Sequence, residues 1–104
     1  MLQIELIGFL AATPEIREGD SGKFLCFDVG VSRKSASGDS VTTWVRCTKA
    51  VMDGGNVAKY MGKGTRVFVR GDLSVTAYMN RNGAAIPTVA CRVRDIKLLG
   101  NGKE

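Results

Sequence analysis

The segment TRVFVRGDLSVTAYMNRNG, residues 65–83, decides how this chain folds, because it joins a long strand pattern to a strong turn signal. Val67 and Val69 fall on one side of an extended chain, and Arg66 and Phe68 fall on the other, since side chains alternate along a strand. An Asn-Gly pair closes the segment and favours a two-residue hairpin turn. The segment therefore predicts half of a β-hairpin with one apolar face and one basic, aromatic face.

Other segments repeat the strand pattern, which predicts an all-β protein. FLCFDVGVS, for example, puts Leu25 and Phe27 on an inner face. A short, glycine-weakened helix is expected between the third and fourth strands. This order is that of the OB-fold, a five-stranded Greek-key β-barrel; a barrel or sandwich of other connectivity stays open. The predicted strands are residues 2–10, 24–32, 41–50, 65–79 and 84–99, with the helix within residues 53–64.

Local breaks in these patterns predict bends and loops. The alternation of the first strand slips at Gly8, which indicates a bulge, and the fourth strand is expected to kink at Gly71. Residues 17–23 and 33–40 are rich in Gly, Ser and Asp; the first is predicted to be a loop or a hairpin turn and the second a polar loop.

Length and composition predict one domain over residues 1–100, with residues 101–104 frayed. No apolar run approaches the roughly 18 residues of a membrane span, and the N-terminus does not resemble a signal peptide. Three scattered cysteines and no histidine favour neither disulfides nor a metal site, and no cofactor is expected. A reducing cytoplasm fits this composition best.

The net charge of +5 is concentrated in the second half of the chain. Residues 1–45 hold four basic and six acidic side chains, whereas residues 46–97 hold ten basic and three acidic ones. A basic region of this kind favours a polyanion such as nucleic acid as a partner, although a merely solvated basic surface is the alternative.

Aromatic and basic side chains share the outer faces of the predicted strands. Trp44 alternates with the same parity as Arg46, Phe68 lies between two arginines, and Tyr78 ends its strand just before Arg81. Binding of single-stranded nucleic acid needs a basic groove and aromatic faces, each worth about 1–3 kcal/mol of base stacking. The alternatives are a core position for Trp44 and a subunit interface for Phe68.

An enzymatic function is not indicated. The chain has no histidine, no conspicuous pair of carboxylates and no candidate base beside a Cys or Ser. It also lacks a glycine-rich phosphate loop between a strand and a helix. The sequence therefore favours a binding protein.

The segments IELIGFLAATPEIR, TTWVRC, NVAKYMGKGTRVFVRGDL and IKLLG resemble the bacterial and phage single-stranded DNA-binding protein family over residues 2–100. The resemblance implies that Trp44 stacks on a base, that Arg46 contacts phosphate and that Tyr78 is the aromatic of the long hairpin. It also implies roles near DNA for Arg17 and Lys63. Members of this family are typically tetramers that pair through their first strand.

The sequence departs from the family pattern in two places. Ala50 stands where the family often has a stacking aromatic, and the basic side chains common before the hairpin aromatic are replaced by Ser, Thr and Ala. The chain also ends at GNGKE without the usual acidic tip, as either a truncated core or a natural short form. Cations expected to offset the lost stacking partly are Arg33, Lys34, Arg70 and Arg81.

These observations predict a non-catalytic protein that coats single-stranded DNA in replication, recombination and repair, with no membrane partner. A homotetramer is favoured over a dimer, and other replication proteins are possible partners. The alternative is an adaptor similar to primosomal replication protein B, a dimeric relative that links single strands to helicase-loading proteins. The sequence does not distinguish RNA from DNA as the ligand.

Overall fold

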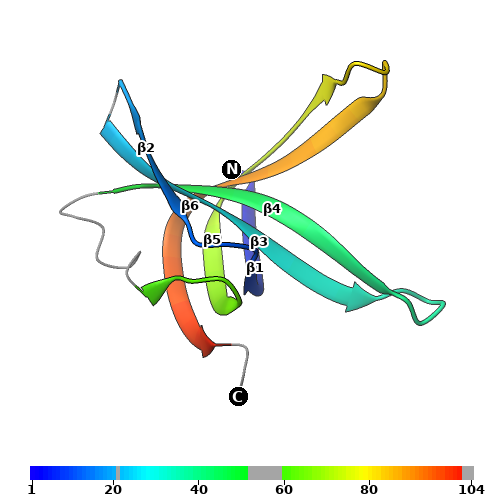
Figure 1. The fold of residues 1–104 in the computed structure, drawn as a ribbon, viewed down its shortest axis with the longest axis horizontal. Helices are drawn as coiled ribbons and strands as arrows, with labels where there is room; N and C mark the ends of the chain where they lie inside the picture. The colour runs from blue at the N-terminus through cyan, green and yellow to red at the C-terminus, as the bar shows by residue number, and fades with distance from the viewer. Residues whose placement is uncertain (21, 52–59, 102–104) are drawn as a thin grey trace.

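The computed structural model describes residues 1–20, 22–51 and 60–101 and shows an all-β protein (Figure 1). The short helix predicted within residues 53–64 falls mostly outside the described residues, and its described end, Tyr60 to Gly64, holds no α-helix, so this prediction is not confirmed. The strands are β1 (Gln3–Leu10), β2 (Glu15–Gly19), β3 (Gly22–Lys34), β4 (Ser40–Ala50), β5 (Thr65–Met79) and β6 (Ala85–Asn101).

Five of the strands form a closed circuit of pairings. The order in the sheet is β1-β5-β6-β4-β3-β2, and β1 also pairs with β3, through Phe9 opposite Gly30 and Leu10 opposite Val29. All pairings are antiparallel except that of β4 with β6. The five strands predicted from the sequence correspond to β1, β3, β4, β5 and β6, and they are the five that close the circuit.

Residues 17–23, expected to form a loop or a hairpin turn, belong to a hairpin of β2 and β3, and β2 is a strand that the sequence did not predict. It pairs with β3 from Glu15 opposite Cys26 to Gly19 opposite Gly22, so β1 and β2 lie one after the other along the same edge of β3. All five β2 residues are exposed, so no alternation of apolar and polar side chains marks this strand in the sequence. Strand β2 is held in place by its pairing with β3.

Glycines allow the strands to cross closely where the circuit closes. A Cβ on Gly8 would lie 2.3 Å from the carbonyl oxygen of Gly30, and a Cβ on Gly71 would lie 2.1 Å from that of Arg92. At Gly71, where a kink of β5 was expected, the β5–β6 register shifts, and the extra residue is Arg94 of β6. The bulge expected at Gly8 is wrong, because the β1–β5 register runs without a shift; the next residue, Phe9, pairs with β5 on one side and with β3 on the other.

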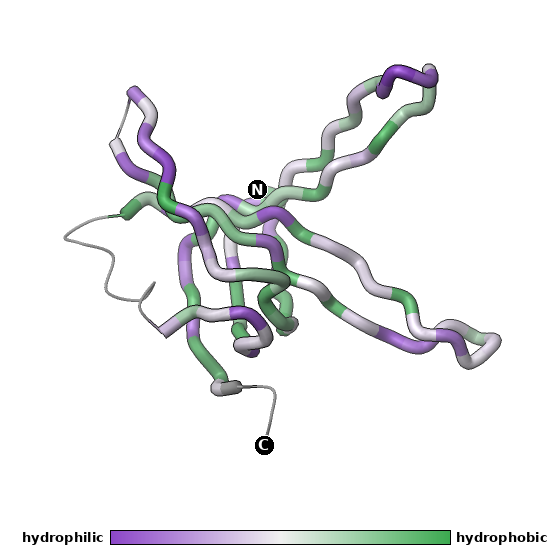
Figure 2. The backbone as a smooth tube through the Cα atoms, in the orientation of Figure 1, coloured by the Kyte–Doolittle hydropathy of each residue, from purple (hydrophilic) through white to green (hydrophobic). Residues whose placement is uncertain are grey.

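The core lies inside the circuit and follows the predicted alternation. Along β3, Leu25, Phe27 and Val29 are buried, and along β4, Val45 and Cys47 are buried. Figure 2 shows apolar positions concentrated along the body of the molecule and hydrophilic ones at the hairpin ends. The remaining buried apolar residues are Leu6, Leu10, Met61, Val67, Val69, Cys91 and Val93.

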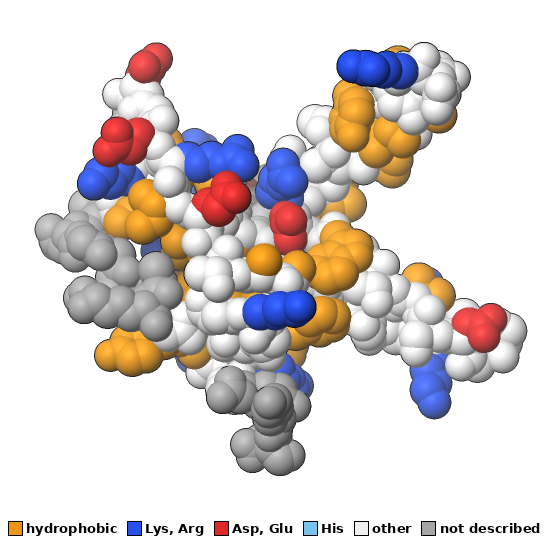
Figure 3. Space-filling view, in the orientation of Figure 1, with side chains coloured by type: hydrophobic (Ala, Val, Ile, Leu, Met, Phe, Trp, Pro, Cys, Tyr) orange, Lys and Arg blue, Asp and Glu red, His pale blue; other side chains and the backbone are white. Residues whose placement is uncertain are grey.

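Two long hairpins project beyond this core on the same side of the molecule, one formed by β3 and β4 and the other by β5 and β6 (Figure 1). On the β5–β6 hairpin, Val75, Tyr78 and Met79 are 59–66 % exposed, because no core reaches that far. The space-filling surface is hollowed between the two hairpins (Figure 3).

Candidate nucleic-acid interface

The outer face of β4 carries the tryptophan and arginine whose common parity the sequence indicated. Val45 and Cys47 are buried, so Trp44, Arg46 and Thr48 point away from the core. Trp44 is 47 % exposed, which rules out the core alternative for this side chain. The predicted sidedness of β4 is confirmed.

Trp44 lies against a flat support made by a glycine. Gly30 stands directly opposite Trp44 on β3, and a Cβ at Gly30 would lie 2.8 Å from the indole Cζ3. The ring of Phe9 meets the indole edge to face, with the ring centroids 5.8 Å apart and the planes at 76°. Such a contact is favourable for aromatic pairs. The indole is therefore held in one orientation while about half of its surface remains open to a ligand.

Arg46 is held loosely by an acidic neighbour. Its Nε donates to Oδ1 of Asp28 at 3.4 Å, and both side chains are largely solvent-exposed, at 61 % and 45 %. Exposed ion pairs contribute about 0–1 kcal/mol, so a phosphate can replace the carboxylate at little cost. Arg46 is thus a positioned cation that can exchange its partner.

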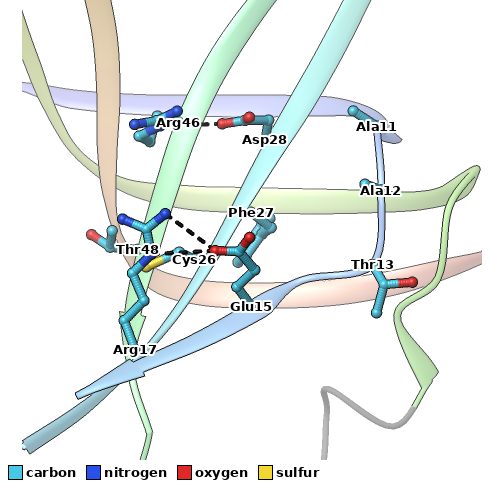
Figure 4. A pocket seen from close by; sticks show the side chains of 10 residues that line it. All are labelled: Ala11, Ala12, Thr13, Glu15, Arg17, Cys26, Phe27, Asp28, Arg46 and Thr48. Atoms are coloured by element: carbon cyan, nitrogen blue, oxygen red, sulfur yellow. Dashed lines mark hydrogen bonds and ion pairs between the residues drawn. The ribbon is translucent and has the colours of Figure 1, made fainter.

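Three shallow depressions follow one another along the outer face of β4, and we call them together the outer groove. The first and second share Asp28 and Arg46, and the second and third share Thr48. Figure 4 shows the second, with Arg17 and Glu15 from β2 beside Cys26 and Asp28 from β3. The first is also lined by Trp44, Tyr78, Pro87, Thr88 and Val89, and the third by Phe24, Ala50, Asp72, Arg92, Val93 and Arg94.

Comparisons with known proteins show the family to which the chain belongs. A model of the single-strand binding protein family matches residues 1–99. The chain belongs to the single-strand binding protein family. The match covers both the strands that build the core and those that line the outer groove.

Relatives and solved structures agree with this family. A single-stranded DNA-binding protein of Chlamydia muridarum is 37 % identical over 93 residues, which are 88 % of this chain and 59 % of that protein. The chain therefore spans about three fifths of the length of this relative.

Two solved structures share the fold of this family member. The crystal structure of a small single-stranded DNA-binding protein from Streptomyces coelicolor has a TM-score of 0.78 at 19 % identity, covering 93 % of both chains. A Plasmodium falciparum SSB complex with ssDNA has a TM-score of 0.71 at 23 % identity, covering 95 % of both chains. These likenesses extend over nearly the whole chain and concern its fold.

Four of the predicted site residues of this family member meet in the outer groove. Trp44, Arg46 and Tyr78 line its first depression, and Arg17 lines its second beside Arg46. Arg17 reaches Glu15 with its guanidinium at 3.1 Å, on a fully exposed strand. The pairing of β3 with both β2 and β4 brings Arg17 near Arg46, and the pairing of β6 with both β4 and β5 brings Tyr78 near Trp44; chain order shows neither.

Three predicted residues lie at the ends of the projecting hairpins. Arg33 and Lys34 end β3, and Arg81 lies in the exposed turn between β5 and β6. Lys34 stands opposite Ser40 and has the parity of Trp44, whereas Arg33 has the opposite parity. Among the described residues none of these three forms an ion pair.

The other three predicted residues do not line the outer groove. Phe68 and Arg70 are on the outer face of β5, between β1 and β6, and Arg70 is ion-paired with Asp95. Phe68 is half-buried opposite Ile7 of β1. Lys63 is exposed in the turn that precedes β5. The parity of Phe68 with its arginines was predicted correctly, but it identifies a different wall of the sheet.

Sequence reasoning left two residues of the third depression off the list of binding residues, Phe24 and Arg92. Arg92 stands opposite Thr48 because β4 and β6 run parallel, and this pairing has no local sequence signal. The alternation of Arg92 with buried Cys91 and Val93 shows that it points outward, but a solvated strand face gives the same pattern. Only the side chains around Arg92 in the folded protein distinguish a binding site from a solvated strand face.

Burial lowers the reactivity of two of the three cysteines. Cys47 and Cys91 stand side by side on β4 and β6 and are both buried. Burial raises the pKa of the Cys47 thiol to about 12 and also raises the pKa of Cys91, so both are protonated at neutral pH. Within the described ranges, no group of three His, Cys, Asp or Glu side chains could hold a metal ion. No described helix has the length and apolar character to cross a membrane.

Proposed function

We propose that this chain is an OB-fold protein that binds single-stranded DNA without sequence preference and without catalysis. The observation that carries the proposal is the first depression of the outer groove, where Trp44, Tyr78 and Arg46 converge from β4 and β5. Aromatic faces stack on any base, and a cation beside them neutralises the phosphate. The closed circuit of five strands supports a barrel, and its relatives in sequence are single-stranded DNA-binding proteins.

The binding model assigns each groove residue a role. Trp44 and Tyr78 each offer a ring to a base, while Arg46 and Arg17 contact phosphates from the middle of the groove. The carboxylates of Asp28 and Glu15 hold these arginines in place when no DNA is bound. Lys34 and Arg81, at the hairpin ends, extend the positive surface along which a strand can run. Stacking and ion pairing of this kind require no cofactor.

A coating role in replication, recombination and repair follows from sequence-tolerant binding and places the protein in the cytoplasm with its DNA. We infer a homotetramer rather than a dimer. In support, Ile7 of β1 is half-exposed and stands opposite Phe68 of β5, which makes an apolar spot on the wall away from the outer groove. Burial of such a spot between subunits is favourable. Lys63 and Arg70 remain secondary candidates for DNA contact.

The adaptor alternative, similar to primosomal replication protein B, is not favoured, because the family match and the relatives in sequence are single-stranded DNA-binding proteins. Competition between matched DNA and RNA oligomers decides between the two nucleic acids. DNA and RNA bases stack on aromatic rings in the same way, so the geometry of the groove does not distinguish the two nucleic acids. Their relative affinities do.

The test of the proposal is a titration of the intrinsic fluorescence of Trp44, the single tryptophan, with oligothymidine. We expect quenching, and we expect the logarithm of the affinity to fall with that of the salt concentration. For about three phosphate contacts the slope is roughly −2. Unquenched fluorescence, or an affinity that does not respond to salt, would contradict the proposal.

Cysteine labelling gives a second, independent prediction. Cys26 is partly exposed and lines the second depression, whereas Cys47, with a pKa of about 12, is about one part in 10,000 thiolate at pH 8. We expect one fast equivalent of thiol to react with a disulfide reagent at pH 8, and oligothymidine to slow that reaction. Cys26→Ser, the matched control, removes the fast phase. Two fast equivalents, or no protection by DNA at saturation, would count against this assignment.

A further inference from the structure

The third depression continues the outer groove beyond the residues used so far. It begins at Thr48, which also lines the second depression, and ends at the cross-strand pair of Phe24 on β3 and Ala50 on β4. Trp44 stands opposite Gly30, six residues from Phe24 along β3. At about 3.3 Å per residue the two aromatic positions are separated by roughly 20 Å along the strand. A strand bound at Trp44 and continuing along β4 therefore reaches Phe24.

Phe24 is an outward-facing aromatic that the core does not use. Leu25 and Phe27 are buried, so Phe24 has the parity of the outer face and is only half-buried. Its Cε2 lies 3.6 Å from where a Cβ on Gly19 would be, an ordinary van der Waals distance, so β2 supports the ring on that side. On the other side its partner is Ala50, whose single methyl group covers less of the ring than a larger side chain would.

The charge beside Phe24 is available to a ligand. Arg94 donates to both carboxylate oxygens of Asp72, at 3.1 and 3.2 Å, so the carboxylate that lines this depression already has a cationic partner. Arg92 is exposed, stands between Asp72 on β5 and Thr48 on β4, and forms no ion pair with any residue that the structure describes. The depression thus offers a ring and a free guanidinium, the same pair of groups as Trp44 and Arg46.

We propose that Phe24 and Arg92 form a second base-and-phosphate position for single-stranded DNA, at the opposite end of the outer groove from Trp44 and Tyr78. This inference rests on the proposed function and extends it by fixing the path of the strand along β4. Phe24 supplies the aromatic face that Ala50 does not, from the neighbouring strand rather than from β4 itself. Arg92 binds the phosphate next to the base on Phe24.

The main test compares Phe24→Leu with the wild-type chain over oligothymidines of about 4 to about 16 nucleotides. Leucine keeps the apolar volume but has no ring to stack. We expect Phe24→Leu to bind the longest oligomers about tenfold more weakly and the shortest, which the Trp44 end accommodates, nearly as well as wild type. Phe24→Tyr restores binding. Tyr60→Leu, at an exposed aromatic outside the groove, is the matched control and leaves binding unchanged.

Arg92 is tested by the salt dependence of binding. Arg92→Gln is expected to weaken binding of the longest oligomers and to reduce the salt slope by about 0.7, the loss of one phosphate contact. Arg66→Gln, an exposed arginine of β5 outside the groove, serves as the control and keeps the wild-type slope.

A relocated fluorophore separates this inference from the proposed function. In a chain carrying Trp44→Phe and Phe24→Trp, the one tryptophan reports on the third depression, and a long oligothymidine is expected to quench it. The inference is overturned if wild-type Trp44 is quenched but the relocated tryptophan is not, or if Phe24→Leu binds every length like wild type. If Trp44 itself is not quenched, the proposed function fails first. Thermal melting of each variant verifies that it is folded.

Discussion

Trp44→Ala is expected to weaken oligothymidine binding by about 1–3 kcal/mol, or about 5-fold to 150-fold in the dissociation constant. The physical reason is that the indole is pre-positioned on Gly30 and against Phe9, so stacking on a base costs little further ordering. Alanine removes this face and leaves Arg46 as a cation without a platform. Because the variant has no tryptophan, the measurement is the fluorescence anisotropy of a labelled oligomer.

The control for this result is Trp44→Phe, which keeps an aromatic ring on Gly30 and should retain most of the affinity. Both variants should melt close to wild type, since about half of the indole surface is in solvent before the substitution. A dissociation constant for Trp44→Ala within a factor of two of wild type would show that the outer groove does not bind DNA by stacking at this position.

Gly71→Ala is expected to destabilise the fold by about 3 kcal/mol, because the added Cβ would overlap the β6 backbone. That Cβ would lie 2.1 Å from the carbonyl oxygen of Arg92 and 2.9 Å from Sγ of Cys91. These atoms belong to a strand that is tied to both β5 and β4, so neither can move without breaking pairings in the circuit. For a domain of this size the midpoint of thermal unfolding should fall by roughly 10–20 °C.

Gly62→Ala is the matched control, because a Cβ there would meet nothing within 4 Å. Its effect should stay within about 0.5 kcal/mol, as for most surface substitutions. Chemical denaturation followed by circular dichroism measures both variants. Equal midpoints for the two would mean that β5 and β6 do not approach as closely at Gly71 as the structure shows.

Pattern reasoning succeeded wherever the feature was a property of one strand. The inward positions of β3 and β4 and the outward Trp44 follow from alternation along a single strand. It failed at β2, where all five residues are exposed and only pairing with β3 makes a strand. It also failed at Gly8, where a bulge was predicted but the β1–β5 register runs without a shift.

The last strand shows why such failures occur. On β6, Cys91 and Val93 face inward, but beyond the register shift opposite Gly71 the inward residues are Ile96 and Leu98. The shift leaves Arg94 without a partner on β5, and this one extra residue inverts the side chains from Asp95 to Leu98, up to a second register shift opposite Arg66 and Val67. Both readings of the alternation are equally acceptable in the sequence alone.

By itself the sequence determined that the protein is all-β, the sidedness of β3 and β4 and the chemistry on their outer faces, because alternation depends only on the local backbone. The tertiary structure decided which outer faces become neighbours. β4 lies between β3 and a parallel β6, and this places Phe24 and Arg92 at one end of the groove that Trp44 and Tyr78 begin, while Phe68 goes to another wall. Such neighbours are set by pairings between residues far apart in the chain, which no local pattern records.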